Sequence, residues 1–163
     1  MTKQGWARML RRIVAFVVAV AVMVVLGSAA HSLLVQHAWS IAAGHADAAR
    51  SAAIPLADRI SWAAHDLAGM IGPYAALTSI ALLIAFLAAG VVVRFSGRRI
   101  VVFGIAGAMA LFTLFTVLKM ALGTVGIFGA RGAIGLAAQM AVGLVAGVLF
   151  AKLTGRTRRT GQS

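Results

Sequence analysis

Hydrophobic residues follow one another along most of this chain in runs long enough to cross a membrane. Four such runs extend over about 13–34, 73–93, 100–122 and 132–153. A membrane-spanning helix needs about 20 mostly apolar residues, because the hydrocarbon core is about 30 Å thick. A helix also satisfies its own backbone hydrogen bonds there. The pattern therefore predicts an all-α polytopic membrane protein, a four-transmembrane-helix bundle that forms a single membrane domain over residues 1–163.

The long connection between the first and second runs, about residues 35–72, mixes apolar and polar positions. Pro55 suits the first turn of a helix, and two glycines with Pro73 are typical of its far end. Trp62 is the kind of amphipathic side chain that anchors at the headgroup level. We expect a short interfacial helix here, separate from the second span and preceded by a second helix over about 38–53.

Basic residues collect on one side of the predicted bundle. Eleven of the fifteen Lys and Arg lie at the two termini and in the connection between the second and third runs, whereas all three acidic residues lie on the other side. Because Lys and Arg mark cytoplasmic loops, we expect an inner-membrane protein with cytoplasmic N- and C-termini. A net charge of +12 would suggest nucleic acid in a soluble protein. Here the charges flank apolar runs, so we expect membrane lipids and no nucleic acid as partners.

The first run also has features of a cleavable signal peptide. A basic start precedes an apolar core over 13–26, and small residues follow at 27–30. Cleavage after Ala30 would leave three helices. The apolar character resumes at Leu33, which makes the segment longer than a usual signal core, so an uncleaved helix is the favoured interpretation.

The composition excludes several kinds of site. The chain has no cysteine, which removes disulfides, thiolate metal sites and cysteine nucleophiles. All histidines and aspartates lie between residues 31 and 66, but none of their spacings is diagnostic of a metal site. Only His31 reaches a span, whereas bound haem favours ligands within the spans. We therefore expect no metal and no cofactor.

Catalysis by a Ser–His–Asp arrangement is also disfavoured. Asp58, Ser61 and His65 would share one face of a single helix, where the geometry for proton relay is poor. We assign no catalytic residue.

Small residues recur at every fourth position of the last run. Close backbone approach drives helix association in lipid, so Gly135, Gly143 and Gly147 are expected to pack against another helix. Packing within one chain is favoured over an interface with another subunit.

Polar residues within the spans fall almost entirely in the predicted outer half, where Gln139 lies roughly 10 Å below the start of its helix. A path for ions needs polar groups through the whole bilayer, so a lone channel or transporter is disfavoured. Lys119 and Arg131 at the outer surface could hold an anionic lipid headgroup, although long cationic side chains also snorkel there without a ligand.

Two stretches carry a resemblance, His65-Asp66-Leu67-Ala68-Gly69 leading to Tyr74, and Gly129-Ala130-Arg131-Gly132 followed by Gln139. With them the chain resembles small, uncharacterised four-helix inner-membrane proteins of proteobacteria. The resemblance implies the architecture and no activity. It directs attention to a candidate outer-face site, whose members are His31, His65, Asp66, Tyr74, Lys119, Arg131 and Gln139.

Three functions remain open. The first is a non-enzymatic accessory or scaffold subunit of a larger membrane assembly, with a protein partner or further copies of the chain. The second is a binder or carrier of a lipid-like molecule through an outer-leaflet polar half-cavity. The third is an outer-face membrane enzyme that uses His65 and Asp66.

Overall fold

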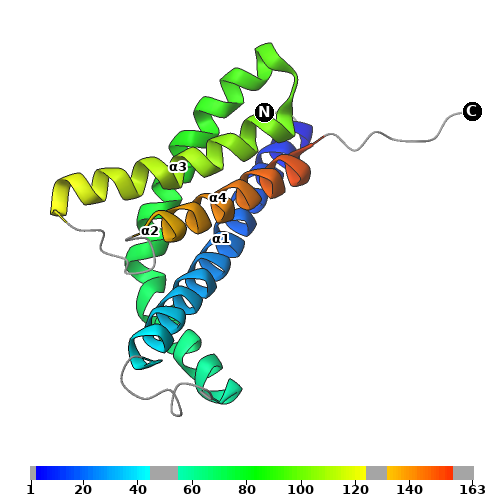
Figure 1. Cartoon of the computed structure of the whole chain (residues 1–163). Coiled ribbons are helices and arrows are strands. Elements are labelled where there is room, and N and C mark those ends of the chain that lie inside the picture. The colour runs from blue at the N-terminus through cyan, green and yellow to red at the C-terminus, as the bar shows by residue number, and fades with distance from the viewer. Residues whose placement is uncertain (1–2, 45–54, 124–131, 156–163) are drawn as a thin grey trace, which may run out of the picture.

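The computed structural model describes residues 3–44, 55–123 and 132–155, and these residues are almost entirely helical. In chain order the helices are α1 (Lys3–Gly44), α2 (Leu56–Ser96), α3 (Arg99–Leu122) and α4 (Ala133–Thr154) (Figure 1). No strand occurs in these described ranges. Four helical stretches are long and apolar enough to cross a membrane, namely Gln4–Gln36, Tyr74–Ser96, Arg99–Ala121 and Ala133–Thr154. The predicted fold class is confirmed: the chain is a multi-pass, all-α membrane protein.

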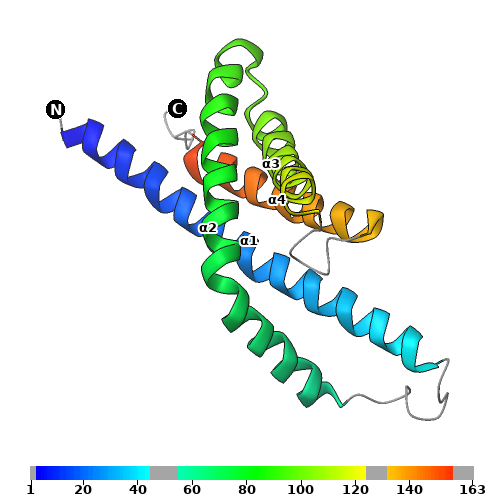
Figure 2. The same cartoon turned by 90° about the vertical axis from the view of Figure 1, so that its left-hand side faces the viewer.

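The segment before the second span is helical, but it is not a separate helix. α2 begins at Leu56 and continues through Gly72 and Pro73 into the span. A proline inside a helix removes one backbone hydrogen bond and usually kinks the helix, which can still continue when the neighbouring turns are stable. Figure 2 shows α2 changing direction along its length, as such a kink produces. The expected helix over 38–53 is continuous with α1 as far as Gly44, and positions 45–54 lie outside the described residues.

A two-residue turn joins α2 to α3. Gly97 adopts a left-handed conformation (φ 67°), and its N–H donates to the carbonyl of Val93 at 3.0 Å. Glycine adopts this conformation without the steric cost that a Cβ imposes, which is why it commonly ends helices. The turn places Arg94, Arg98 and Arg99 at one end of the bundle.

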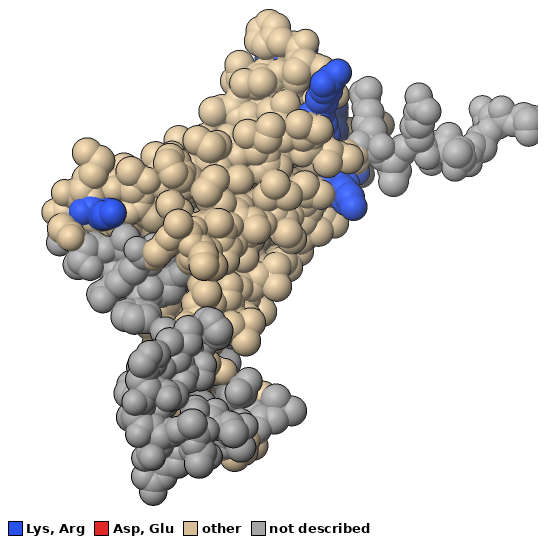
Figure 3. All heavy atoms as spheres, in the orientation of Figure 1, with Lys and Arg blue, Asp and Glu red and all other residues tan. Residues whose placement is uncertain are grey.

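Arginines from two helices close this same end around the last turn of α4. Nη2 of Arg11 donates to the carbonyls of Thr154 (3.0 Å) and Gly155 (2.9 Å), and Nε of Arg99 donates to the carbonyl of Ala151 (3.2 Å). The final carbonyls of a helix lack partners within it, so cationic donors there stabilise the helix end. We call this part of the bundle the basic end; Lys and Arg side chains gather there in Figure 3. The opposite end is called the far end.

Glycines bring α3 and α4 into backbone contact. A Cβ added to Gly143 would lie 2.3 Å from the carbonyl oxygen of Gly107, and one added to Gly147 would lie 1.9 Å from that of Phe103. Both distances are far inside van der Waals contact, so these positions accept only glycine without moving a helix. Gly135 is also buried, one further member of the same α4 face. This close approach makes the α3–α4 pair the most tightly joined part of the bundle.

Replacing Gly147 with alanine should therefore weaken the bundle. Overpacking of a tight core typically costs about 1–3 kcal/mol, and here the new methyl group meets a backbone carbonyl, which cannot rotate away. Gly90→Ala is the matched control, since a Cβ there meets no atom within 4 Å. The measurement is loss of helical circular dichroism as sodium dodecyl sulfate displaces a mild detergent. Equal midpoints for the two variants would contradict the close contact.

Candidate functional site

A buried polar cluster joins three helices in the half of the bundle towards the far end. Tyr74 on α2 donates from Oη to Oε1 of Gln139 on α4 at 2.8 Å. Nε2 of Gln139 then donates to the backbone carbonyl of Gly27 on α1 at 3.1 Å. Gln139 is 0% and Tyr74 3% exposed. One glutamine side chain thus links α2 to α1 through two hydrogen bonds shielded from lipid.

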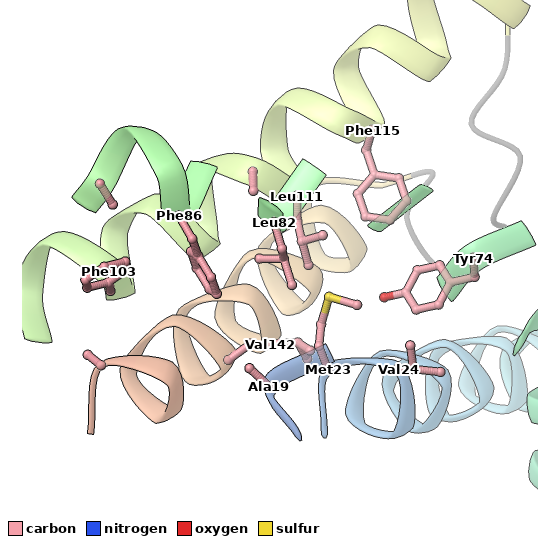
Figure 4. Packing of buried hydrophobic residues seen from close by; sticks show 14 residues of the cluster. Ala19, Met23, Val24, Tyr74, Leu82, Phe86, Phe103, Leu111, Phe115 and Val142 are labelled. Carbon is pink, nitrogen blue, oxygen red and sulfur yellow. The ribbon is translucent and has the colours of Figure 1, made fainter. Parts of the chain in front are cut away.

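Gly27 makes this linkage possible. A Cβ on Gly27 would lie 2.1 Å from Oη of Tyr74, so any other residue would push the phenol away from Gln139. Figure 4 shows the Tyr74 ring directed from α2 towards Met23 of α1, with Phe115 of α3 nearby. The hydroxyl is therefore buried within the bundle, where its hydrogen bond to Gln139 compensates for the loss of solvent contact.

Other buried hydroxyls lie next to this linkage. Thr78, which is 0% exposed, donates to the carbonyl of Tyr74 one turn earlier on α2. Ser28, 2% exposed, has a hydroxyl oxygen without a hydrogen-bond partner in the described part of the chain. Ser32 and Gln36 continue the buried polar face of α1 towards the far end. We call Gly27, Ser28, Tyr74, Thr78 and Gln139 the interhelical polar cluster.

The structure places the predicted outer-face residues in different surroundings. It brings Tyr74 and Gln139 together, and His31 lies half-buried one turn beyond Gly27 on α1. His65 is exposed on α2, and Lys119 is exposed near the end of α3. The side chain of Asp66 and all of Arg131 lie outside the described residues. A shared site for His65, Asp66, Lys119 and Arg131 therefore stays a prediction.

Gln36 lies in a helix interior that the sequence pattern does not predict. The first predicted run ends at Leu34, which places Gln36 in the connection, whereas α1 continues through it. Ser28, Ser32 and Gln36 recur at every fourth position, and this period is the signal that places them on one helix face. Within the described residues, no group of three histidines and acidic side chains is placed to hold a metal ion.

Comparison of the chain with protein-family models, with curated proteins and with solved structures finds no match. The hydrogen bonds of the interhelical polar cluster connect helices, and its groups are enclosed by the chain itself, which suits a role in holding the bundle together.

Removing either partner of the Tyr74–Gln139 hydrogen bond should lower the free energy of unfolding, and the effects of the two substitutions should not be additive. Hydrogen bonds between membrane helices contribute about 0.6–2 kcal/mol. Tyr74→Phe leaves the Gln139 oxygen without its donor, and Gln139→Leu removes both bonds of the amide. Detergent-unfolding midpoints of the two single variants and the double variant give the coupling energy, which we expect to be about 0.5–2 kcal/mol. Additive effects would show that the bond contributes nothing.

Proposed function

We propose that this protein is a non-enzymatic accessory or scaffold subunit of a larger membrane assembly, and that it receives a transmembrane helix of its partner. One observation carries the proposal, an apolar groove of about 710 Å³ that runs between α2 and α3. We call it the α2–α3 groove. Its long axis follows the spans, and thus the direction in which a partner helix would lie.

The lining of the α2–α3 groove suits a helix. Alanines contribute much of it, and larger apolar side chains stand beside them; Ile84 is 64% and Ile105 57% exposed. From Leu77 to Val92 the groove follows α2 for about 23 Å at roughly 1.5 Å per residue, most of a hydrocarbon core about 30 Å thick. Alanine allows close approach of a second helix, and the larger residues beside it can interdigitate with that helix. The alanines that line the groove are Ala81, Ala85, Ala88, Ala89, Ala106 and Ala110.

The interhelical polar cluster supports the same conclusion. Its Tyr74–Gln139–Gly27 hydrogen bonds hold α1, α2 and α4 together and leave the α2–α3 groove on the outside of the bundle. A stiff bundle with an apolar groove on its lipid-facing side is a suitable support for another membrane protein.

Filling the groove should release the partner. The exposed Ala88 lines the groove, so Ala88→Phe adds a bulky side chain where the partner helix would pack. Tagged wild-type and variant chains are purified from the native membrane in a gentle detergent, and the proteins that accompany them are quantified. We expect a stoichiometric partner with the wild type and a loss of at least tenfold with Ala88→Phe.

Ala137→Phe is the matched control, because Ala137 is exposed on α4 and lies away from the groove. It should retain the partner. Photo-crosslinking from Met109, which lines the groove and is 46% exposed, should trap the same partner. A chain that purifies without a stoichiometric protein, or a partner that survives Ala88→Phe, would refute the proposal.

A further inference from the structure

A second groove lies on the other side of α2, and its character differs from that of the first. It has a volume of about 570 Å³ and is lined by all four helices, chiefly by α2. Its opening towards the basic end carries three arginines, Arg12 of α1, Arg94 of α2 and Arg99 of α3. We call it the arginine groove.

Within the described residues, no ion pair balances the charge at this opening. All three acidic residues of the sequence lie between positions 47 and 66. The distance along α2 from Asp58 to Arg94 is up to about 54 Å, at roughly 1.5 Å per residue. Arg99 and Arg12 line the same opening, and Arg11 binds the same last turn of α4 as Arg99, so their like charges repel one another here. Arg99 is held in place by its bond to Ala151 and by the Phe103 ring, 5.1 Å from its guanidinium carbon. An anion at the opening would relieve this repulsion.

Arg12 and Arg94 are available to bind such an anion. Both are exposed, and within the described residues neither guanidinium makes a hydrogen bond or an ion pair. Guanidinium groups bind phosphate oxygens through paired N–H donors, so a phosphate suits an opening lined by several arginines. The fixed Arg99 and the two arginines without partners therefore line one opening with a strong positive charge.

Below the arginines the groove becomes apolar. Phenylalanines from each helix pack at its base, with Phe86 stacked on Phe150 at 4.7 Å between ring centroids and Phe16 edge-on to Phe86 at 6.2 Å. Leu83 and Arg94 mark its extent on α2, about 16 Å at roughly 1.5 Å per residue. This length is about half of a hydrocarbon core about 30 Å thick, the depth of one leaflet. Gly90 lies along this wall, and a Cβ there would meet no atom within 4 Å.

We propose that the arginine groove binds an anionic glycerophospholipid, with the phosphate at Arg12, Arg94 and Arg99 and one acyl chain along Leu83, Leu87 and Phe16. Basic pockets between transmembrane helices commonly hold anionic headgroups. A soluble phosphate would use the arginines but leave the apolar wall empty, whereas a phospholipid matches both the charge and the one-leaflet depth. This site is distinct from the α2–α3 groove and does not depend on a protein partner.

The test uses the purified full-length chain, delipidated in a mild detergent and titrated with phosphatidylglycerol or phosphatidylcholine, with bound lipid counted by native mass spectrometry. The double variant R12Q/R94Q removes the two free arginines. R98Q/K152Q removes the same charge from exposed positions of the basic end that do not line the groove. Each basic residue near a membrane surface contributes about 1 kcal/mol towards anionic lipid, so R12Q/R94Q should weaken phosphatidylglycerol binding by at least about tenfold. The control pair should change it by less than about threefold.

Gly90→Leu tests the acyl-chain part without changing any charge. A Cβ at Gly90 meets no atom within 4 Å and Gly90 lines the groove, so we expect the leucine side chain to occupy the groove without disturbing the bundle, which helical circular dichroism checks, and phosphatidylglycerol binding to fall by at least about fivefold. Equal losses in R12Q/R94Q and R98Q/K152Q would reduce the effect to general surface charge and overturn the proposal. Equal binding of phosphatidylcholine and phosphatidylglycerol to the wild type, or undiminished binding to Gly90→Leu, would overturn it as well.

Discussion

The close approach of α3 and α4 is the contact on which the rest of the bundle depends. In lipid the hydrophobic effect does not draw helices together, so association rests on packing and on hydrogen bonds between helices. At Gly107, Gly143 and Gly147 the two backbones approach until no space for a Cβ remains. The other links are then made from the α3–α4 pair. The last turn of α4 receives arginines from α1 and α3, and Gln139 in its first half reaches α1 and α2.

Gln139 shows how a polar group can be stabilising at this depth. An amide enclosed by apolar side chains is costly unless its donor and acceptor are both used. Here the oxygen accepts from Tyr74 and the nitrogen donates to Gly27, so the groups that would be costly alone satisfy one another. Gly27 is required because it has no side chain, since a Cβ there would displace the Tyr74 ring. The linkage therefore depends on three residues far apart in the sequence.

The fold could be predicted from the sequence, because a long apolar run in lipid forms a helix, which satisfies its own backbone hydrogen bonds. Four runs of about 20 residues predict four spanning helices, and the described residues contain four helices long and apolar enough to cross a membrane. The start of the second helix is harder to predict than its existence. Gly72 and Pro73 are typical of a helix end, but here they lie inside α2. Local propensity alone does not decide such a case, because neighbouring turns can carry a helix across a proline.

The sites were less predictable for a related reason. That Gln139 lies in the predicted outer half follows from its position along one helix, but its pairing with Tyr74 depends on how three helices cross. The arginine groove has the same origin, since Arg12, Arg94 and Arg99 come from three helices and meet only at the basic end. Periodicity within a helix indicates which side is polar or small. It does not indicate which sides of different helices meet.

α2 is the helix whose surface remains most open, and its attachment explains why. Side chains rather than close backbones join it to α4, with Tyr74 bonded to Gln139 towards the far end and Phe86 stacked on Phe150 towards the basic end. Because long side chains hold α2 at a distance, space is left on both sides of it. Ala85 and Ala88 line the space towards α3, and Leu87 and Gly90 line the space that opens at the arginines. Tyr74 attaches α2 towards the far end and lines neither groove, whereas Phe86 and Phe150 attach it at the base of the second groove. α2 is thus fixed at two points along its span, and the surfaces on either side of these attachments stay open.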